Sequence, residues 1–306
     1  MSSLHKRWPA LFLAALFLFL CGCGGSRKPA GADPPVYSPP RVLVPEFSFS
    51  KSPDSLPLLL DLSKTDNGYL AAKNNSADKK VNLQLASLET QPYSYFLSPG
   101  ELAFIPFTEG NGEYILTCYL QASSDRYAAL YSQNLDVKVK NEFYPFLYPN
   151  QYVNFTPESK ACKTALSMME ENTPDTQALE QIYNLVVDNV KYDTHKAETV
   201  PAGYLPDIDE TLRTGEGICF DYAALMAAML RARDIPCRLQ IGYAGTTRHA
   251  WIDVYLRSAG WINKAIQYDG NVWSRLDPTF DSNSSDKEEI RAFIGDGTNY
   301  TVQFTR

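Results

Sequence analysis

One stretch, residues 215–233 with the sequence GEGICFDYAALMAAMLRAR, constrains the fold of this chain most strongly. Gly215 and Gly217 permit a close approach of the backbone, and the residues after them are strong helix formers. The pattern therefore predicts a helix with Cys219 at its N-terminus. There the unpaired backbone N–H groups and the helix dipole favour a thiolate, so Cys219 is a candidate nucleophile. The alternative role for this cysteine is that of a small buried hydrophobe.

A thiolate nucleophile needs a base, and the chain contains three histidines, His5, His195 and His249. His249 begins the segment HAWIDVYL, whose alternation predicts a strand with one buried face. Because a strand holds an imidazole rigidly, His249 is the candidate base. Trp251 shares its face and is a candidate to shield the site from water, although ordinary packing explains it equally well. His195 is interpreted as a solvated loop histidine, and His5 lies in a segment that we expect to be removed.

The third group of such a site orients the imidazole by hydrogen bonding its second nitrogen. Asp277 suits this role because it ends the strand-like segment VWSRLD, and Pro278 prevents that strand from simply continuing. An aspartate before a proline is also a common turn initiator, so the assignment depends on the neighbouring motifs.

Three motifs, GEGICFDYA, RHAWIDVY and WSRLDPT, occur in this order and together resemble the transglutaminase-like superfamily. The resemblance implies an α+β, papain-like core in which a nucleophile helix packs on an antiparallel sheet. It implies Cys219 as nucleophile, His249 as general base and acid, and Asp277 as the orienting carboxylate. Packing is the simpler role for Tyr204, and the resemblance offers as the alternative that its hydroxyl donates to an oxyanion. The backbone N–H of Cys219 is a more general donor.

The first 22 residues predict an export signal, since Lys6 and Arg7 precede the apolar run LFLAALFLFL. This run is too short to span a bilayer comfortably as a mature helix. The sequence LCGC that follows resembles the lipobox of bacterial lipoproteins, which implies cleavage before Cys23 and lipidation of its thiol. An uncleaved anchor is the alternative. We therefore expect the protein to be exported and lipid-anchored to the extracytoplasmic face of a bacterial membrane.

The rest of the chain divides by composition. Residues 23–41 comprise the lipidated cysteine and a flexible tether rich in Gly, Pro and Ser. Residues 42–140 predict a small all-β, sandwich-like domain, whose plainest strand candidates are VNLQLASL, YSYFL, AFIPF, EYILTCYL and LDVKV. Residues 141–306 predict the transglutaminase-like domain.

Within the second domain the aromatic segment 142–155 predicts an ordered connector. Thr156 and Thr173 each precede a proline and predict the starts of two helices. Residues 192–214 have little periodicity and predict a long loop that forms one wall of the cleft. After the cysteine helix, CRLQIGYA predicts another strand.

Composition narrows the possible partners. The formal net charge is -7, and loss of Lys6 and Arg7 would lower it further. No basic patch indicates nucleic acid. The other mature cysteines, which we expect to be mostly reduced and buried, lack the spacing of zinc or iron-sulfur sites, and we expect neither a metal nor another cofactor. They are Cys118, Cys162 and Cys237.

The chemistry that these residues favour is thiol acyl transfer on peptide or protein amides. For an anchored cell-surface protein we expect hydrolysis, as in a cysteine protease or amidase, more than cross-linking. A protein-glutamine transglutaminase is the first alternative, because the triad alone does not distinguish the two reactions. A catalytically silent surface binding or assembly module is the second. The sequence indicates no oligomeric state.

Overall fold

The computed structural model describes residues 40–50, 57–88, 90–124, 126–262, 266–268, 273–275 and 300–306. Val36–Arg306 form one compact unit. The predicted signal, Cys23 and nearly all of the tether lie outside the described residues, as does Asp277. Within the described ranges no helix is long and apolar enough to cross a bilayer. The proposed boundaries at residues 42 and 141 stay predictions.

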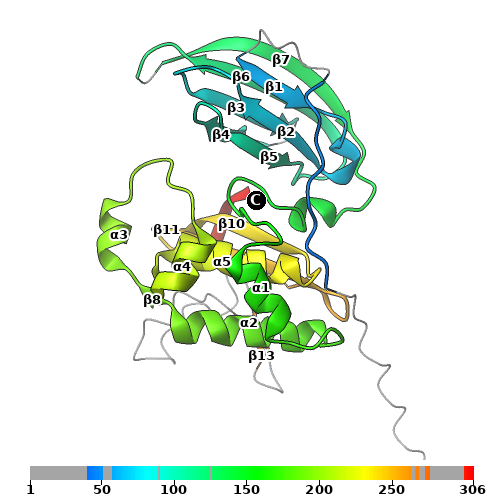
Figure 1. The fold of residues 1–306 in the computed structure, drawn as a ribbon, viewed down its shortest axis with the longest axis vertical. Coiled ribbons are helices and arrows are strands. Elements are labelled where there is room, and N and C mark those ends of the chain that lie inside the picture. Colours follow the sequence, from blue (N-terminus) through cyan, green and yellow to red (C-terminus); the bar gives the residue numbers. More distant parts are fainter. Residues whose placement is uncertain are drawn as a thin grey trace, which may run out of the picture. The chain divides into compact units, whose positions relative to one another are not determined.

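Two antiparallel sheets make up the N-terminal region (Figure 1). Apolar side chains from both sheets, such as Leu70 and Ile105 from one and Leu83 and Leu116 from the other, share a single buried core. The predicted sandwich-like arrangement is therefore present. Each of the five predicted segments overlaps a strand, although LDVKV does so only in part because β7 ends at Val137. One sheet has the order β1(Leu58–Asp61), β2(Tyr69–Asn74), β5(Leu102–Pro106), and the other β4(Tyr93–Leu97), β3(Val81–Ser87), β6(Gly112–Gln121), β7(Tyr127–Val137).

The aromatic connector is ordered, as predicted, and it packs on both sides. The Phe143 ring lies 4.3 Å from the ring of Tyr255, measured between centroids. The Tyr152 hydroxyl donates a hydrogen bond to the carbonyl oxygen of Ser94 in β4 at 3.0 Å. A short 3-10 turn, η2(Tyr144–Phe146), lies in this segment.

The helices differ from the sequence prediction in two places. The first begins at Lys160 rather than near Thr156, because the N–H groups of Lys160 and Ala161 donate to the carboxylate of Asp209, each at 2.9 Å. The expected loop over residues 192–214 was wrong, since it contains α3 and α4. The helices are α1(Lys160–Ser167), α2(Asp175–Asn189), α3(Thr194–Thr199), α4(Ile208–Thr214) and α5(Cys219–Ala232).

An aspartate caps each of the two unexpected helices. Asp193 accepts a hydrogen bond from the N–H of Lys196, and Asp207 accepts from the N–H groups of Asp209 and Glu210. Aspartate is a preferred residue at this position because its carboxylate satisfies N–H groups that have no partner within the helix. The capping aspartates were thus a sequence signal for these helices.

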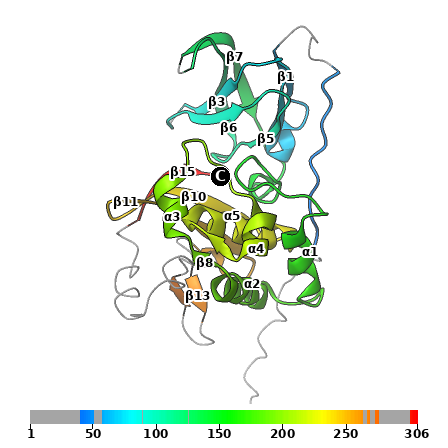
Figure 2. The same cartoon turned by 60° about the vertical axis from the view of Figure 1, so that its left-hand side comes forward.

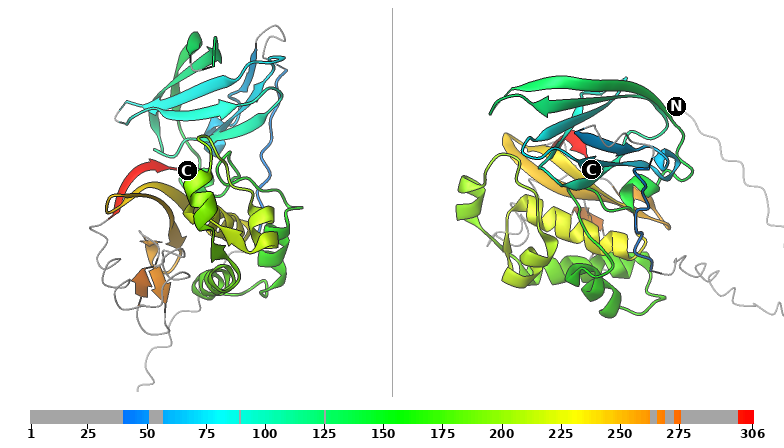
Figure 3. Two further views of the ribbon diagram at one scale, coloured as in Figure 1. Left: turned by 90° about the vertical axis from the view of Figure 1, so that its left-hand side faces the viewer. Right: turned by 45° about the horizontal axis from the view of Figure 1, so that its top comes forward.

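The cysteine helix α5 packs on a curled antiparallel sheet (Figure 3). It contacts β10 and β11 of this sheet as well as α1, α2 and α4 (Figure 2). Every residue from Asp221 to Ala232 is buried, so the helix is enclosed rather than buried along one stripe. The order of the sheet is β12(Gly260–Ile262), β11(Thr247–Leu256), β10(Cys237–Ala244), β15(Tyr300–Thr305). This α+β arrangement is the predicted fold class.

Two small ladders complete the described strands. They are the parallel pair β8(Lys191–Tyr192) with β9(Glu216–Gly217), and the antiparallel pair β13(Ile266–Tyr268) with β14(Trp273–Arg275).

Candidate active site

Cys219 is the first residue of α5, as the sequence predicts. Two glycines set the approach to this helix. Gly215 has φ +66°, and a Cβ atom there would lie 2.7 Å from the carbonyl oxygen of Asn189. A Cβ at Gly217 would lie 2.8 Å from the Cβ of Asp221. Both positions therefore need glycine, one for its backbone angle and both for space.

Exposure separates Cys219 from the other cysteines of the described chain. All four are free, but only Cys219 is partly exposed. Burial raises the pKa of Cys118, Cys162 and Cys237 to about 12, which keeps these thiols protonated and inert at neutral pH. Along the described chain, no backbone carbonyl accepts a hydrogen bond from the N–H of Cys219. Cys219 thus combines access with a helix N-terminus.

His249 lies in β11, opposite Gly242 of β10. Its side chain is buried, at 6% exposure, and its ring is stacked on that of Trp251, with 6.4 Å between centroids and 19° between planes. The prediction of one buried face for this strand was wrong. Trp251 and Asp253 are buried together with Ala250 and Ile252, because rings such as that of Tyr300 cover the second face.

A pocket of about 740 Å³ brings the predicted residues together. Cys219, His249 and Tyr204 all line it, and residues 200–204 form part of its wall. Part of the segment predicted to form one wall of the cleft therefore does line the pocket, with α3 before it and α4 after it in the sequence. Trp251 is 1% exposed and packs between His249 and Tyr300 outside this lining. His195 is exposed on α3, in agreement with its interpretation as a solvated residue.

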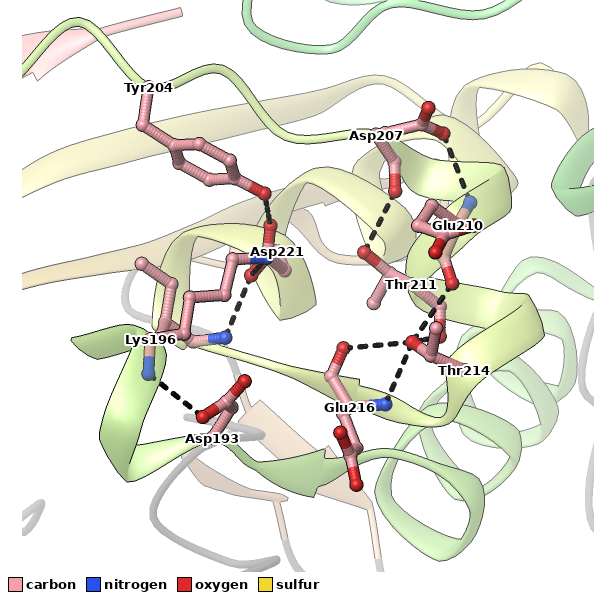
Figure 4. A network of polar contacts seen from close by, with 10 residues as sticks. Asp193, Lys196, Tyr204, Asp207, Glu210, Thr211, Thr214, Glu216 and Asp221 are labelled. Carbon is pink, nitrogen blue, oxygen red and sulfur yellow. Dashed lines mark hydrogen bonds and ion pairs between the residues drawn. The ribbon is translucent and has the colours of Figure 1, made fainter. Parts of the chain in front are cut away.

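From the sequence no role was identified for Asp221, which lies in the first turn of α5. Its carboxylate is fully buried and has three partners (Figure 4). It accepts hydrogen bonds from the N–H of Ile218 at 2.8 Å and from the Tyr204 hydroxyl at 2.5 Å. It also pairs with the ammonium group of Lys196 at 2.7 Å. Asp221 thus connects the start of α5 to α3 and to the pocket wall.

This network changes the proton affinities of its members. Burial and the hydrogen bond to Asp221 together raise the pKa of Tyr204 to about 12. Burial alone would lower the pKa of Lys196, but the contact with Asp221 outweighs it and the pKa is raised. The hydroxyl of Tyr204 has a single proton and donates it to Asp221, so in this arrangement it offers none to an oxyanion.

The described residues contain no group of three or more His, Cys, Asp or Glu side chains that could hold a metal ion.

Comparison with known proteins identifies the class of the C-terminal region. The family model of the transglutaminase-like superfamily matches residues 163–278. These residues carry a transglutaminase-like superfamily core, as the three motifs predict. None of the curated proteins matches the chain.

Two solved structures are similar to this chain. One is a proposed cysteine protease from Cytophaga hutchinsonii, with 15% identity, a TM-score of 0.36, and coverage of 78% of this chain and 79% of that one. The other is the red sea bream transglutaminase, with 12% identity, a TM-score of 0.30, and coverage of 72% of this chain and 49% of that one.

Proposed function

We propose that this protein is a thiol acyl-transfer enzyme that acts on peptide or protein amides, with Cys219 as nucleophile and His249 as general base and acid. The single observation that carries the proposal is that these two residues, from different elements, both line one pocket. The other free cysteines of the described chain are buried and therefore unsuited to this role. Asp277 is the proposed orienting carboxylate on the strength of its motif.

The proposed reaction begins when the Cys219 thiolate attacks the carbonyl carbon of an amide. A C–S bond forms and the carbonyl π electrons move to oxygen, where the backbone N–H of Cys219 is available as a donor. The C–N bond then breaks, and the imidazolium of His249 protonates the departing amine. The product of this half-reaction is a thioester on Cys219.

Two outcomes are open to that thioester. Water activated by His249 would give a carboxylic acid and make the protein a cysteine protease or amidase. An amine would give a new amide and make it a transglutaminase. We propose hydrolysis as the main outcome, as we expect for the exported, lipid-anchored protein that residues 1–41 predict.

The first experiment measures the rate of iodoacetamide alkylation at Cys219 against pH in the full chain, read by mass spectrometry of the peptide that contains this residue. A thiolate paired with imidazolium should react well below the free-thiol pKa of about 8.5. In His249→Ala this low-pH reaction should disappear. The matched control is His195→Ala, which removes the exposed histidine of α3 and should leave the profile unchanged.

A profile that follows an ordinary thiol titration in all three proteins would contradict the proposal and favour a silent binding module. If the low-pH reaction is present, incubation with casein and dansylcadaverine separates the two outcomes. Release of new N-termini indicates hydrolysis, whereas incorporation of the fluorescent amine indicates transamidation.

A further inference from the structure

The charged side chains among the described residues that line the active-site pocket are those of arginines. Arg248 and Arg306 line it together with His249, and no Asp or Glu occurs among its described lining residues. This differs from the chain as a whole, in which 35 acidic residues outnumber 28 lysines and arginines. The described lining of the pocket is therefore cationic, in a protein that is acidic as a whole.

Arg306 is the more unusual of the two arginines. It is 3% exposed, and its guanidinium lies over four aromatic rings, at 4.3 Å from the centroid of Tyr93, 4.5 Å from Tyr152, 4.9 Å from Tyr95 and 5.2 Å from Phe304. Its Nε atom is buried and has no hydrogen-bond partner in the described structure. The ring faces stabilise the cation in part, and its Nη1 donates a long hydrogen bond of 3.5 Å to the hydroxyl of Tyr95.

Arg248 lies at the pocket mouth, where its side chain is exposed, one residue before His249 in β11. Neither guanidinium forms an ion pair with a carboxylate of the described residues. The nearby carboxylate of Asp221 is already paired with Lys196 and hydrogen-bonded to Tyr204, so it does not compensate the charge of either arginine. The positive charge of the pocket is therefore not neutralised by these groups.

The apolar walls strengthen the effect of that charge. Tyr152 and Phe220 line the pocket with their rings 6.2 Å apart, and Tyr204 meets Phe220 edge to face at 6.4 Å. Aromatic walls exclude water and lower the local dielectric constant, so a charge acts over a longer distance there than at an open surface. A buried guanidinium with an unused N–H is best satisfied by a carboxylate, which accepts in the plane of the fork.

From these observations we infer that the pocket selects acidic peptide segments, in which a carboxylate lies close to the amide that reacts. Arg248 would attract such a segment at the mouth and Arg306 would bind a carboxylate deeper in the pocket, beside the aromatic walls. This inference rests on the proposed function for the reaction itself, but the charge preference can be tested at the thiol without any turnover.

The test compares two alkylating reagents of similar size at Cys219 of the full chain. Iodoacetate carries a carboxylate and iodoacetamide is its neutral counterpart. The ratio of their rate constants at pH 9, divided by the same ratio for N-acetylcysteine, measures how much the pocket favours an anion. We expect a value of about ten or more at low ionic strength, falling as salt is added.

Matched variants assign the preference to the arginines. Arg248→Gln and Arg306→Gln should each lower the ratio several-fold, whereas Lys138→Gln, which removes an exposed cation outside the pocket lining, should not. Arg306→Lys keeps the charge and should retain most of the preference. It therefore keeps the test informative if the glutamine variant fails to fold. A wild-type ratio equal to that of N-acetylcysteine overturns the inference, and so does a raised ratio that neither arginine variant lowers.

His249→Ala separates this inference from the proposed function. Loss of the imidazole should slow both reagents at low pH and leave most of the pH 9 ratio in place. If the thiol titrates normally, the catalytic proposal fails while the ratio can still be read.

A second measurement extends the test to peptides. An octapeptide with four glutamates should protect Cys219 from iodoacetamide at lower concentration than its glutamine counterpart, and Arg248→Gln should abolish the difference. Equal protection by both peptides would contradict the inferred substrate class.

Discussion

The hydroxyl of Tyr204 donates a hydrogen bond to the buried carboxylate of Asp221 at 2.5 Å. Tyr204 belongs to the wall of the pocket, and Asp221 lies in the first turn of the helix that begins with Cys219. One contact therefore fixes the wall relative to the thiol. Lys196 adds a second connection to the same carboxylate from α3.

Asp221→Asn should lower the free energy of unfolding by about 2 kcal/mol, because an amide has one acceptor oxygen where three donors now meet a carboxylate. Urea denaturation measures this change. The control is Glu210→Gln, which breaks an ion pair with Arg213 whose side chains are 53% and 59% exposed. Such an exposed pair contributes little, so the control should shift stability by less than about 1 kcal/mol. Equal losses in the two variants would show that the buried network contributes no more to the free energy of unfolding than an exposed ion pair does.

Alkaline pH should weaken the same network. The pKa of Tyr204 is raised to about 12 in the folded protein, against about 10 for an unfolded tyrosine. The folded state therefore keeps the phenolic proton longer, and the stability that this provides is complete below pH 10 and is lost as pH rises toward 12. The raised pKa of Lys196 acts with the same sign.

Urea midpoints at pH 9 and pH 11 test this prediction. Tyr204→Phe should lose less stability between the two values than the wild type, because it has no phenol to ionise at this site. Both proteins retain Tyr69 and Tyr93, whose pKa values burial raises to about 12. Part of the loss of stability at alkaline pH should therefore persist in the variant. If the urea midpoint of the wild type falls no further between pH 9 and pH 11 than that of Tyr204→Phe, Tyr204 does not contribute to the alkaline loss of stability.

Arg231→Met should be among the most destabilising substitutions in the protein. The guanidinium is fully buried and donates to the backbone oxygens of Cys237, Tyr148 and Arg306 at 2.8–3.1 Å. Methionine would remove all of these hydrogen bonds at a cost of about 3 kcal/mol or more, although the oxygen of Arg306 would still accept from the N–H of Leu239. Arg231→Lys should rescue little, because a single ammonium cannot reach acceptors arranged for a planar fork. Thermal unfolding measures both, and full rescue by lysine would show that only the charge matters.

Gly215→Ala should destabilise the protein through two separate effects. Alanine is strained at φ +66°, by about 1–2 kcal/mol, and its Cβ would also meet the carbonyl oxygen of Asn189 at 2.7 Å. Gly100 has φ +79° but no heavy atom within 4 Å of an added Cβ. Gly100→Ala therefore measures the backbone strain alone, and the larger loss expected for Gly215→Ala measures the clash. Equal losses would mean that the structure yields at Asn189.

The sequence predicted those parts of the structure that depend on local patterns. Cys219 at a helix start and His249 in a strand followed from glycine placement and alternation, and both residues line the pocket. The third predicted residue, Asp277, lies outside the described residues. The short helices α3 and α4 escaped prediction because each has fewer than two full turns of pattern, although Asp193 and Asp207 mark their starts.

What the sequence did not reveal depends on contacts between distant segments. Asp209 caps α1 from another helix, and Asp221 meets Lys196 and Tyr204 only after the chain has folded. The guanidinium of Arg306 lies over rings that come from the N-terminal sheet and the connector, far away in the sequence. No periodicity along one stretch encodes such pairings.

The strand β15 pairs with β10 on the side opposite β11. Without residues 300–306 the second edge of β10 would have no strand partner in this sheet. An open edge recruits other strands, so a chain interrupted before residue 300 should tend to self-associate. It would also lack Arg306 and Phe304, which line the pocket. The strand that completes this edge of the sheet thus also completes the described lining of the pocket.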